Sequence, residues 1–313
     1  ALIITLPPVE PSPPSPPPPP PPPPSPPQPP ATAAPALRVS ARVAVVTDST
    51  SYLPRGWAAD LGIAVVPVQV IVDGKPLDET DDDQAQQVTV ALSALRPVST
   101  SRPSPERFLQ AFRAARTAGA TEIVVATLSS AMSATYESAL LAARDAEIPV
   151  TVIDSGSIAM GLGFAVSRGA EAARGGSDAA TVTRIIEQSA HSASVLFYVD
   201  TLEYLRRGGR VSSTKAAMGQ ALQVKPLLHV ENGRVEPLEK LRTAGKALAR
   251  LAELAMSAAS VGACDIAVQH LAAPERAHML AEQLRTACTG STVIECPVGG
   301  VVGAHVGPGM VAV

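Results

Sequence analysis

Four short runs of apolar, mostly β-branched residues alternate with helical patterns, and they constrain the fold more than any other feature of the chain. The runs are VAVVT (43–47), VVPVQVIV (65–72), IVVAT (123–127) and VTVID (150–154). Amphipathic stretches at 82–95, 104–117 and 132–146 lie between them. Continuous apolar strands separated by helices are typical of a parallel sheet covered by helices on both faces. We therefore predict that the first part of the chain is an α/β domain.

The pattern changes after Asp154. Helical patterns at 160–173 and 179–190 precede a strand at 194–199, and PLLHVENGRVEPLEK (226–240) reads as a β-hairpin. Its Asn232-Gly233 pair is the favoured type I′ turn. Further helices and strands follow at 244–259, 265–270, 274–287 and 291–295. A hairpin mixed with helices indicates a second domain with a mixed sheet.

The first 41 residues have a different composition. They hold most of the 31 prolines, and a proline run forms neither a helix nor a central strand. We predict a disordered, proline-rich tail over residues 1–41, with extended polyproline II conformations. The opening ALIITL has no basic flank and is too short for the core of a signal peptide, so we expect no export signal and no transmembrane span.

Charge and residue composition exclude several classes of function. The net charge is −3 and only 3% of the residues are aromatic, which disfavours nucleic-acid binding. The three cysteines form no C-x-x-C pair, and the five histidines show no metal-binding spacing. We expect reduced thiols, no metal, no cofactor and a cytoplasmic location.

Small polar residues follow three strands of the predicted parallel sheet, in VVTDSTS (45–51), VATLSS (125–130) and VIDSGS (152–157). Ligands of open α/β sheets bind beyond these strand ends, and helix N-termini there attract anions. Such residues also cap helices, and capping is the first interpretation for Asp48 and Ser104. One serine suffices as a cap, so the pair Ser129-Ser130 leaves binding and capping equally open. His305, in GGVVGAHVGPG (299–309), reads on its own as a core histidine.

Catalytic motifs are absent from the sequence. There is no G-x-S-x-G elbow, no G-x-x-x-x-G-K-[ST] loop and no G-x-G-x-x-G after the first strand. A hydrolase or phosphotransferase that uses Ser130 and His305 is the alternative, but no acidic residue that could orient His305 is near it in sequence. The polar groups indicate a binding site for an anion and no catalytic residue.

Several longer motifs together resemble a known family. They are VTDSTSYLP (46–54), TSRPSPERF (100–108), TLSSAMSATYESA (127–139), VIDSGSIAMGLG (152–163), TLEYLRRGGRVS (201–212), GQALQVKPLLHVENGRV (219–235) and HVGPG (305–309). In this order they resemble the DegV family of bacterial fatty-acid-binding proteins, the lipid-carrying subunits of fatty acid kinase. The resemblance spans residues 43–313 and leaves out the proline tail.

The resemblance implies a fold and a ligand. It implies a three-layer α/β/α domain with a parallel sheet (42–157) and a two-layer α/β domain with a mixed sheet that encloses lipid (158–313). A long-chain fatty acid lies with its tail buried, and hydroxyls and a histidine hold its carboxylate. The family's threonine falls on Thr100, its serine on the pair Ser129-Ser130, with Ser130 favoured, and its histidine on His305.

The resemblance also implies partners. A separate ATP-dependent catalytic subunit of the kinase phosphorylates the bound carboxylate, and the acyl phosphate then passes to a membrane acyltransferase. The arginines that support work with the kinase fall on Arg210 and Arg242. A lipid sensor without a kinase partner remains a further alternative. Ala134 and Ala159 replace the usual glycine and serine of two motifs, which affects the expected contacts and chain-length preference more than the class of ligand.

Overall fold

A parallel sheet, sheet A, organises the first part of the chain. The computed structural model describes residues 42–79, 83–211, 224–262 and 264–313, so the predicted proline-rich tail lies outside the described residues. The strand order of sheet A is β2-β1-β6-β7, and every pair is parallel. Its strands are β1 (Val43–Asp48), β2 (Ile63–Val66), β6 (Glu122–Thr127) and β7 (Val150–Asp154).

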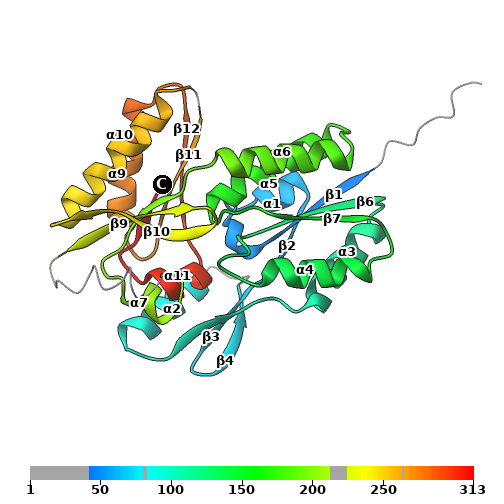
Figure 1. Ribbon diagram of the computed structural model, residues 1–313, viewed down its shortest axis with the longest axis horizontal. Helices are drawn as coiled ribbons and strands as arrows, with labels where there is room; N and C mark the ends of the chain where they lie inside the picture. The colour runs from blue at the N-terminus through cyan, green and yellow to red at the C-terminus, as the bar shows by residue number, and fades with distance from the viewer. Residues whose placement is uncertain (1–41, 80–82, 212–223, 263) are drawn as a thin grey trace, which may run out of the picture. The chain divides into compact units, whose positions relative to one another are not determined.

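Helices cover both faces of sheet A (Figure 1). They are α5 (Met160–Arg174) and α6 (Ala179–Ser192) on one face and α3 (Pro105–Thr117) and α4 (Thr135–Arg144) on the other. Successive strand residues alternate between the two cores, because side chains along a strand point to opposite faces. Val45 and Val124 pack toward α5 and α6, whereas Val46 and Val125 pack toward α3 and α4. The predicted parallel sheet between helical layers is confirmed.

A small antiparallel sheet, sheet B, was not predicted. Its order is β4-β3-β5, from β3 (Gln69–Val72), β4 (Lys75–Asp78) and β5 (Val98–Ser101). The sequence predicts one strand over 65–72, and this prediction is wrong: the run divides at Pro67, and β2 and β3 belong to different sheets. Proline lacks the N–H that a central strand must donate, so it marks the break. Helix α2 (Asp83–Ser93) connects β4 to β5 in the chain.

The second sheet, sheet C, is mixed, as predicted. Its order is β10-β9-β8-β13-β11-β12, and of the pairs within it only β11 and β12 run parallel. The strands are β8 (Leu196–Tyr198), β9 (Lys225–Glu231), β10 (Arg234–Leu241), β11 (Asp265–His270), β12 (Thr292–Pro297) and β13 (Val311–Ala312). Asn232 and Gly233 both have positive φ, at 49° and 74°, which a type I′ turn requires, so the predicted hairpin is confirmed.

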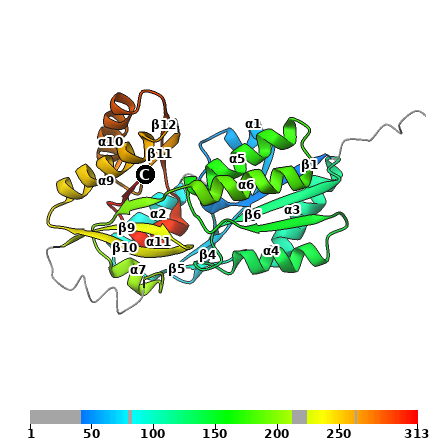
Figure 2. The same ribbon diagram turned by 45° about the horizontal axis from the view of Figure 1, so that its top comes forward.

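Helices α9 (Ala244–Ala259) and α10 (Pro274–Ala287) pack on one face of sheet C (Figure 2). The opposite face packs against α7 (Glu203–Arg207) and α11 (Gly300–Val306), through Leu205 and Val306. This second face carries the candidate site. The boundary proposed at residues 157 and 158 stays a prediction, and α5 and α6, which follow it, pack on sheet A.

The two expected caps differ in their outcome. Asp48 accepts a hydrogen bond from the backbone N–H of Thr50, 2.9 Å away, and caps the short 3-10 turn η1 (Ser49–Ser51) as expected. Ser104 occupies the N-cap position of α3, but its side chain makes no capping hydrogen bond, so that expectation is wrong in detail. Pro105 begins α3, and its missing N–H is one that a helix start leaves unpaired.

Candidate functional site

A cavity of about 340 Å³ lies between the inner face of sheet C, helix α11 and the loops that follow β5 and β6. Most of its lining is apolar, from side chains such as Phe197, Val230, Val235, Val302, Val306 and Met310. Its polar lining residues are Thr100, Ser101, Arg102, Ser133, Arg210 and His305. No acidic residue is found among the described residues that line it. The cavity therefore suits an apolar ligand that carries a negative charge.

Thr100 and His305 meet at this cavity although 205 positions separate them in the chain. Thr100 lies on β5 and His305 in the last turn of α11. The Thr100 hydroxyl and Nε2 of His305 are 2.9 Å apart. The family resemblance assigns both residues to one carboxylate-binding site, and the tertiary structure brings them into hydrogen-bond contact.

His305 is a neutral imidazole at physiological pH. Burial, together with the nearby positive charge of Arg210, lowers its pKa from 6.5 to about 4. Its Nδ1 is buried and has no hydrogen-bond partner among the described residues. Gly208 packs against the ring: a Cβ there would lie 2.8 Å from Cε1 of His305 and closer still to Nδ1. The bare surroundings of His305 therefore include a glycine distant in sequence as well as those of its own segment.

Two arginines flank one short stretch of backbone beside the cavity. Arg210 donates from Nε and Nη2 to the carbonyl of Met132, at 3.0 and 2.9 Å. Arg102 donates from Nη1 to the carbonyl of Ala134, at 3.3 Å. Ser133 lies between these two carbonyls and lines the cavity. Since no carboxylate among the described lining residues neutralises the two guanidinium groups, the cavity is electropositive beside them.

Ser129 and Ser130 are not among the described residues that line the cavity, although Leu128 and Met132 on either side of them are. The Ser129 hydroxyl donates to the carbonyl of Gly233 at 2.7 Å, and accepts from the N–H of Ala131. The Ser130 hydroxyl donates to the carboxylate of Asp154, which also accepts from the Ser130 N–H at 3.0 Å. Ser129 therefore fixes the tip of the β9–β10 hairpin, and Ser130 joins the ends of β6 and β7.

The sequence reading missed Ser133 and Arg102. Ser133 is a third hydroxyl in the same motif, SSAMSATY, and that repetition was the available signal. Arg102 sits two residues after Thr100, in TSRPS, and only its position beside the cavity identifies it. Arg242 follows β10, is exposed and is not among the described lining residues, so the structure does not bring it to Thr100 and His305.

A half-buried carboxylate, that of Glu79, holds the start of α11. Glu79 accepts from the N–H of Val301 at 2.8 Å and from the hydroxyl of Ser49 at 2.7 Å. The Tyr52 hydroxyl accepts from the N–H of Val302 at 3.0 Å and donates to Glu79 at 3.0 Å. A Cβ at Gly299 would lie 2.7 Å from the Tyr52 ring, so only glycine admits this approach. Burial raises the pKa of Glu79 to about 7.

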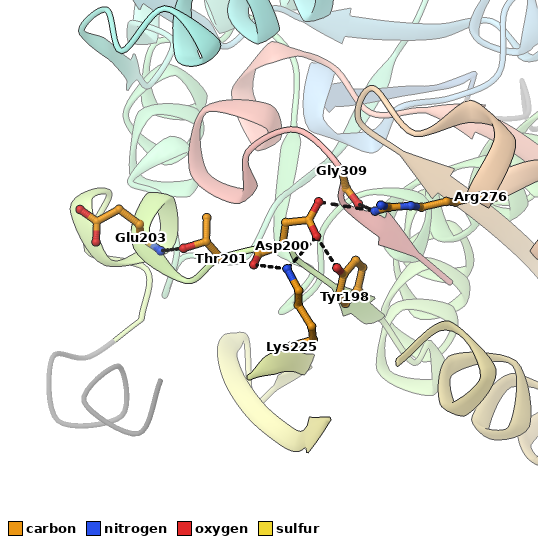
Figure 3. A network of polar contacts seen from close by, with 7 residues as sticks. All are labelled: Tyr198, Asp200, Thr201, Glu203, Lys225, Arg276 and Gly309. Atoms are coloured by element: carbon orange, nitrogen blue, oxygen red, sulfur yellow. Dashed lines mark hydrogen bonds and ion pairs between the residues drawn. The ribbon is translucent and has the colours of Figure 1, made fainter. Parts of the chain in front are cut away.

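A second polar network holds the turn after α11 (Figure 3). Asp200 accepts from Tyr198, from Lys225 at 3.1 Å and from Arg276 at 3.4 Å. Arg276 also donates to the carbonyl of Gly309, at 3.4 Å. Gly309 has a φ of 90° and faces Asp200 without room for a Cβ. Helix α11 is thus fixed at both ends, which sets the position of His305.

Neither a metal-binding cluster nor a membrane-spanning helix is found in the described part of the chain. No group of three or more His, Cys, Asp or Glu residues there could hold a metal ion. In the same residues, no helix is long and apolar enough to span a membrane.

The fold and cavity define a class of protein: helices packed on a parallel sheet and on a separate mixed sheet, with a mainly aliphatic cavity whose lining includes cationic and hydroxyl groups. The model of the family described as "Uncharacterised protein, DegV family" matches residues 42–313. The DegV domain-containing protein SCO2569 of Streptomyces coelicolor is 47% identical over 276 residues, which is 88% of this chain and 98% of that protein. The chain belongs to the DegV family.

Solved structures share this fold. A DegV family protein from Thermus thermophilus, described for its fatty acid binding, is 29% identical with a TM-score of 0.80. DegV from Bacillus subtilis, described as a fatty acid binding protein, is 30% identical with a TM-score of 0.80. In each case the match covers 87% of this chain and 98% of the other.

Proposed function

We propose that this protein binds one long-chain fatty acid, with the tail in the aliphatic cavity and the carboxylate beside Thr100 and His305. The observation that carries the proposal is the 2.9 Å contact between these residues at the electropositive end of an otherwise apolar cavity. The fatty acid binding described for the Thermus thermophilus and Bacillus subtilis proteins supports the same ligand.

The energetics of such a ligand favour this arrangement. Each buried methylene contributes about 0.8 kcal/mol as an upper estimate, so the tail provides most of the affinity. A carboxylate out of water is costly unless its oxygens accept hydrogen bonds. Thr100 and Ser133 offer hydroxyl donors, and Arg102 and Arg210 supply positive charge. A neutral His305 carries one N–H; with this proton on Nε2, His305 donates to the Thr100 hydroxyl, whose own proton is then free for the carboxylate.

We further propose that the protein is a non-catalytic subunit that presents the carboxylate to a separate ATP-dependent kinase. The sequence has no phosphate-binding loop of the G-x-x-x-x-G-K-[ST] type, so ATP would be bound by the partner. Arg210 lies where it can stabilise the added charge of an acyl phosphate. The exposed Arg242 is the residue we assign to contact with the kinase, and a membrane acyltransferase would receive the acyl phosphate.

Mass spectrometry tests the ligand. Protein purified from a bacterial host, then denatured and extracted, should release a long-chain fatty acid, and stripped protein should take up palmitate or oleate. The variant His305→Ala should retain much less. The matched control is His278→Ala, since His278 is exposed and pairs with Glu295 at 3.2 Å on the surface. Neither co-purified lipid nor uptake of added fatty acid by folded protein would contradict the proposal.

A further inference from the structure

A second cavity lies directly behind the first. It measures about 370 Å³ and is lined by the start of α5, the ends of α6 and α9, and strands β11 and β13. Val195 and Ala312 line both cavities. Two consecutive residues at the start of α5 line different cavities: Ala159 lines the first and Met160 the second. The two cavities are therefore separated by a wall one side chain thick.

Val195 closes this wall against Gly161. A Cβ at Gly161 would lie 2.8 Å from Cγ2 of Val195, so the valine methyl rests on the glycine backbone. Val195 is only 9% exposed. Its carbonyl accepts from the N–H of Val230 at 2.9 Å, which fixes the backbone on sheet C. A β-branched side chain on a fixed backbone has few rotamers, so the barrier is stiff.

Three of the polar side chains that line the second cavity are already paired. Arg168 and Asp265 form an ion pair at 2.8 Å. The side chain of Gln269 accepts from the N–H of Met160 at 3.0 Å, and it donates to the sulfur of Cys296 at 3.5 Å. Because these groups need no partner from a ligand, the space can receive an apolar chain without leaving them unpaired.

We propose that Val195, backed by Gly161 and Ala312, sets the longest acyl tail that the first cavity holds. Shortening Val195 joins the two cavities, and the second then receives the far end of a longer tail. This inference rests on the proposed function, because it takes the ligand of the first cavity to be a fatty acid. It assigns Val195 a role in specificity, distinct from that of the groups proposed to hold the carboxylate.

Binding of saturated fatty acids of increasing length, measured on lipid-stripped protein, tests this role. In the natural protein, affinity should rise by up to about fourfold per methylene, then stop rising at one length. In Val195→Ala the rise should continue to longer chains. Val235→Ala is the matched control: Val235 is buried and lines the first cavity only, so this variant should alter affinity without moving the length at which the rise stops.

Val195→Phe makes the opposite change and should move that length to shorter chains, which keeps the test valid if Val195→Ala fails to fold. The same limiting length in the natural protein and in a folded Val195 variant would overturn the inference while leaving fatty acid binding intact. If the natural protein binds no fatty acid of any length, the proposed function fails, and the role of Val195 fails with it.

Discussion

Gly208→Ala should disturb the candidate site although Gly208 is not among the described residues that line the cavity. The backbone φ of Gly208 is −73°, so alanine is compatible with the local conformation and the effect is steric. The new methyl would lie within 2.8 Å of the His305 ring, where ordinary contacts are 3.4–4 Å. Overpacking of this size costs about 1–3 kcal/mol of folding free energy. The displaced ring loses its contact with Thr100, so fatty acid affinity should also fall.

A double-mutant cycle isolates this contact. Urea unfolding gives the free energy of unfolding of Gly208→Ala in the natural protein and in His305→Ala. In His305→Ala there is no ring to displace, so the loss of unfolding free energy caused by Gly208→Ala in that background should drop below about 0.5 kcal/mol. Gly245→Ala is the control, because a Cβ there meets nothing within 4 Å in helix α9. Equal costs in both backgrounds would refute the reasoning, as would no cost in the natural protein.

Other predictions concern charge and the proposed partner. The pKa of His305 is lowered, so its contribution to the free energy of unfolding falls by about 3 kcal/mol at most as pH falls from 7 to 4. The pKa of Glu79 is raised, so its contribution rises by about as much as pH falls from 7 to 4.5. In urea titrations, acidification should therefore lower the stability of Glu79→Gln relative to the natural protein and raise that of His305→Ala relative to it; parallel curves would contradict this. Arg210→Ala should raise the pKa of His305, measured by NMR, since it removes a nearby positive charge; an unchanged pKa would count against it. Thr100→Val should weaken fatty acid binding about tenfold in a calorimetric titration, and unaltered affinity would remove Thr100 from the site. Arg242→Ala should keep fatty acid binding and abolish acyl phosphate formation with the kinase, and an emptied cavity would contradict its assigned role.

Local patterns in the chain were sufficient for most of the elements. The β-branched runs of sheet A and the Asn232-Gly233 turn follow from preferences that act over a few residues. The exceptions are segments whose structure depends on distant partners. GGVVGAHV has low helix propensity, yet it forms α11, because Glu79 and Tyr52 accept its first N–H groups. Val311–Ala312 is too short to predict as a strand, and it pairs with β8 and β11 inside sheet C.

The candidate site divides in the same way. Motif resemblance pointed to Thr100 and His305. Thr100 lies on β5 of sheet B and His305 on α11, which packs against sheet C, so no local rule places their side chains 2.9 Å apart. Ser129 and Ser130 carry the same hydroxyl as Ser133, and only the tertiary structure directs the first two to Gly233 and Asp154 and the third to the cavity. The sequence by itself determined that a parallel sheet and a mixed sheet form, and that hydroxyl, imidazole and guanidinium side chains are available for a site. Which of those groups meet, and which side chains such as Val195 line the cavity, depended on packing between segments far apart in the chain.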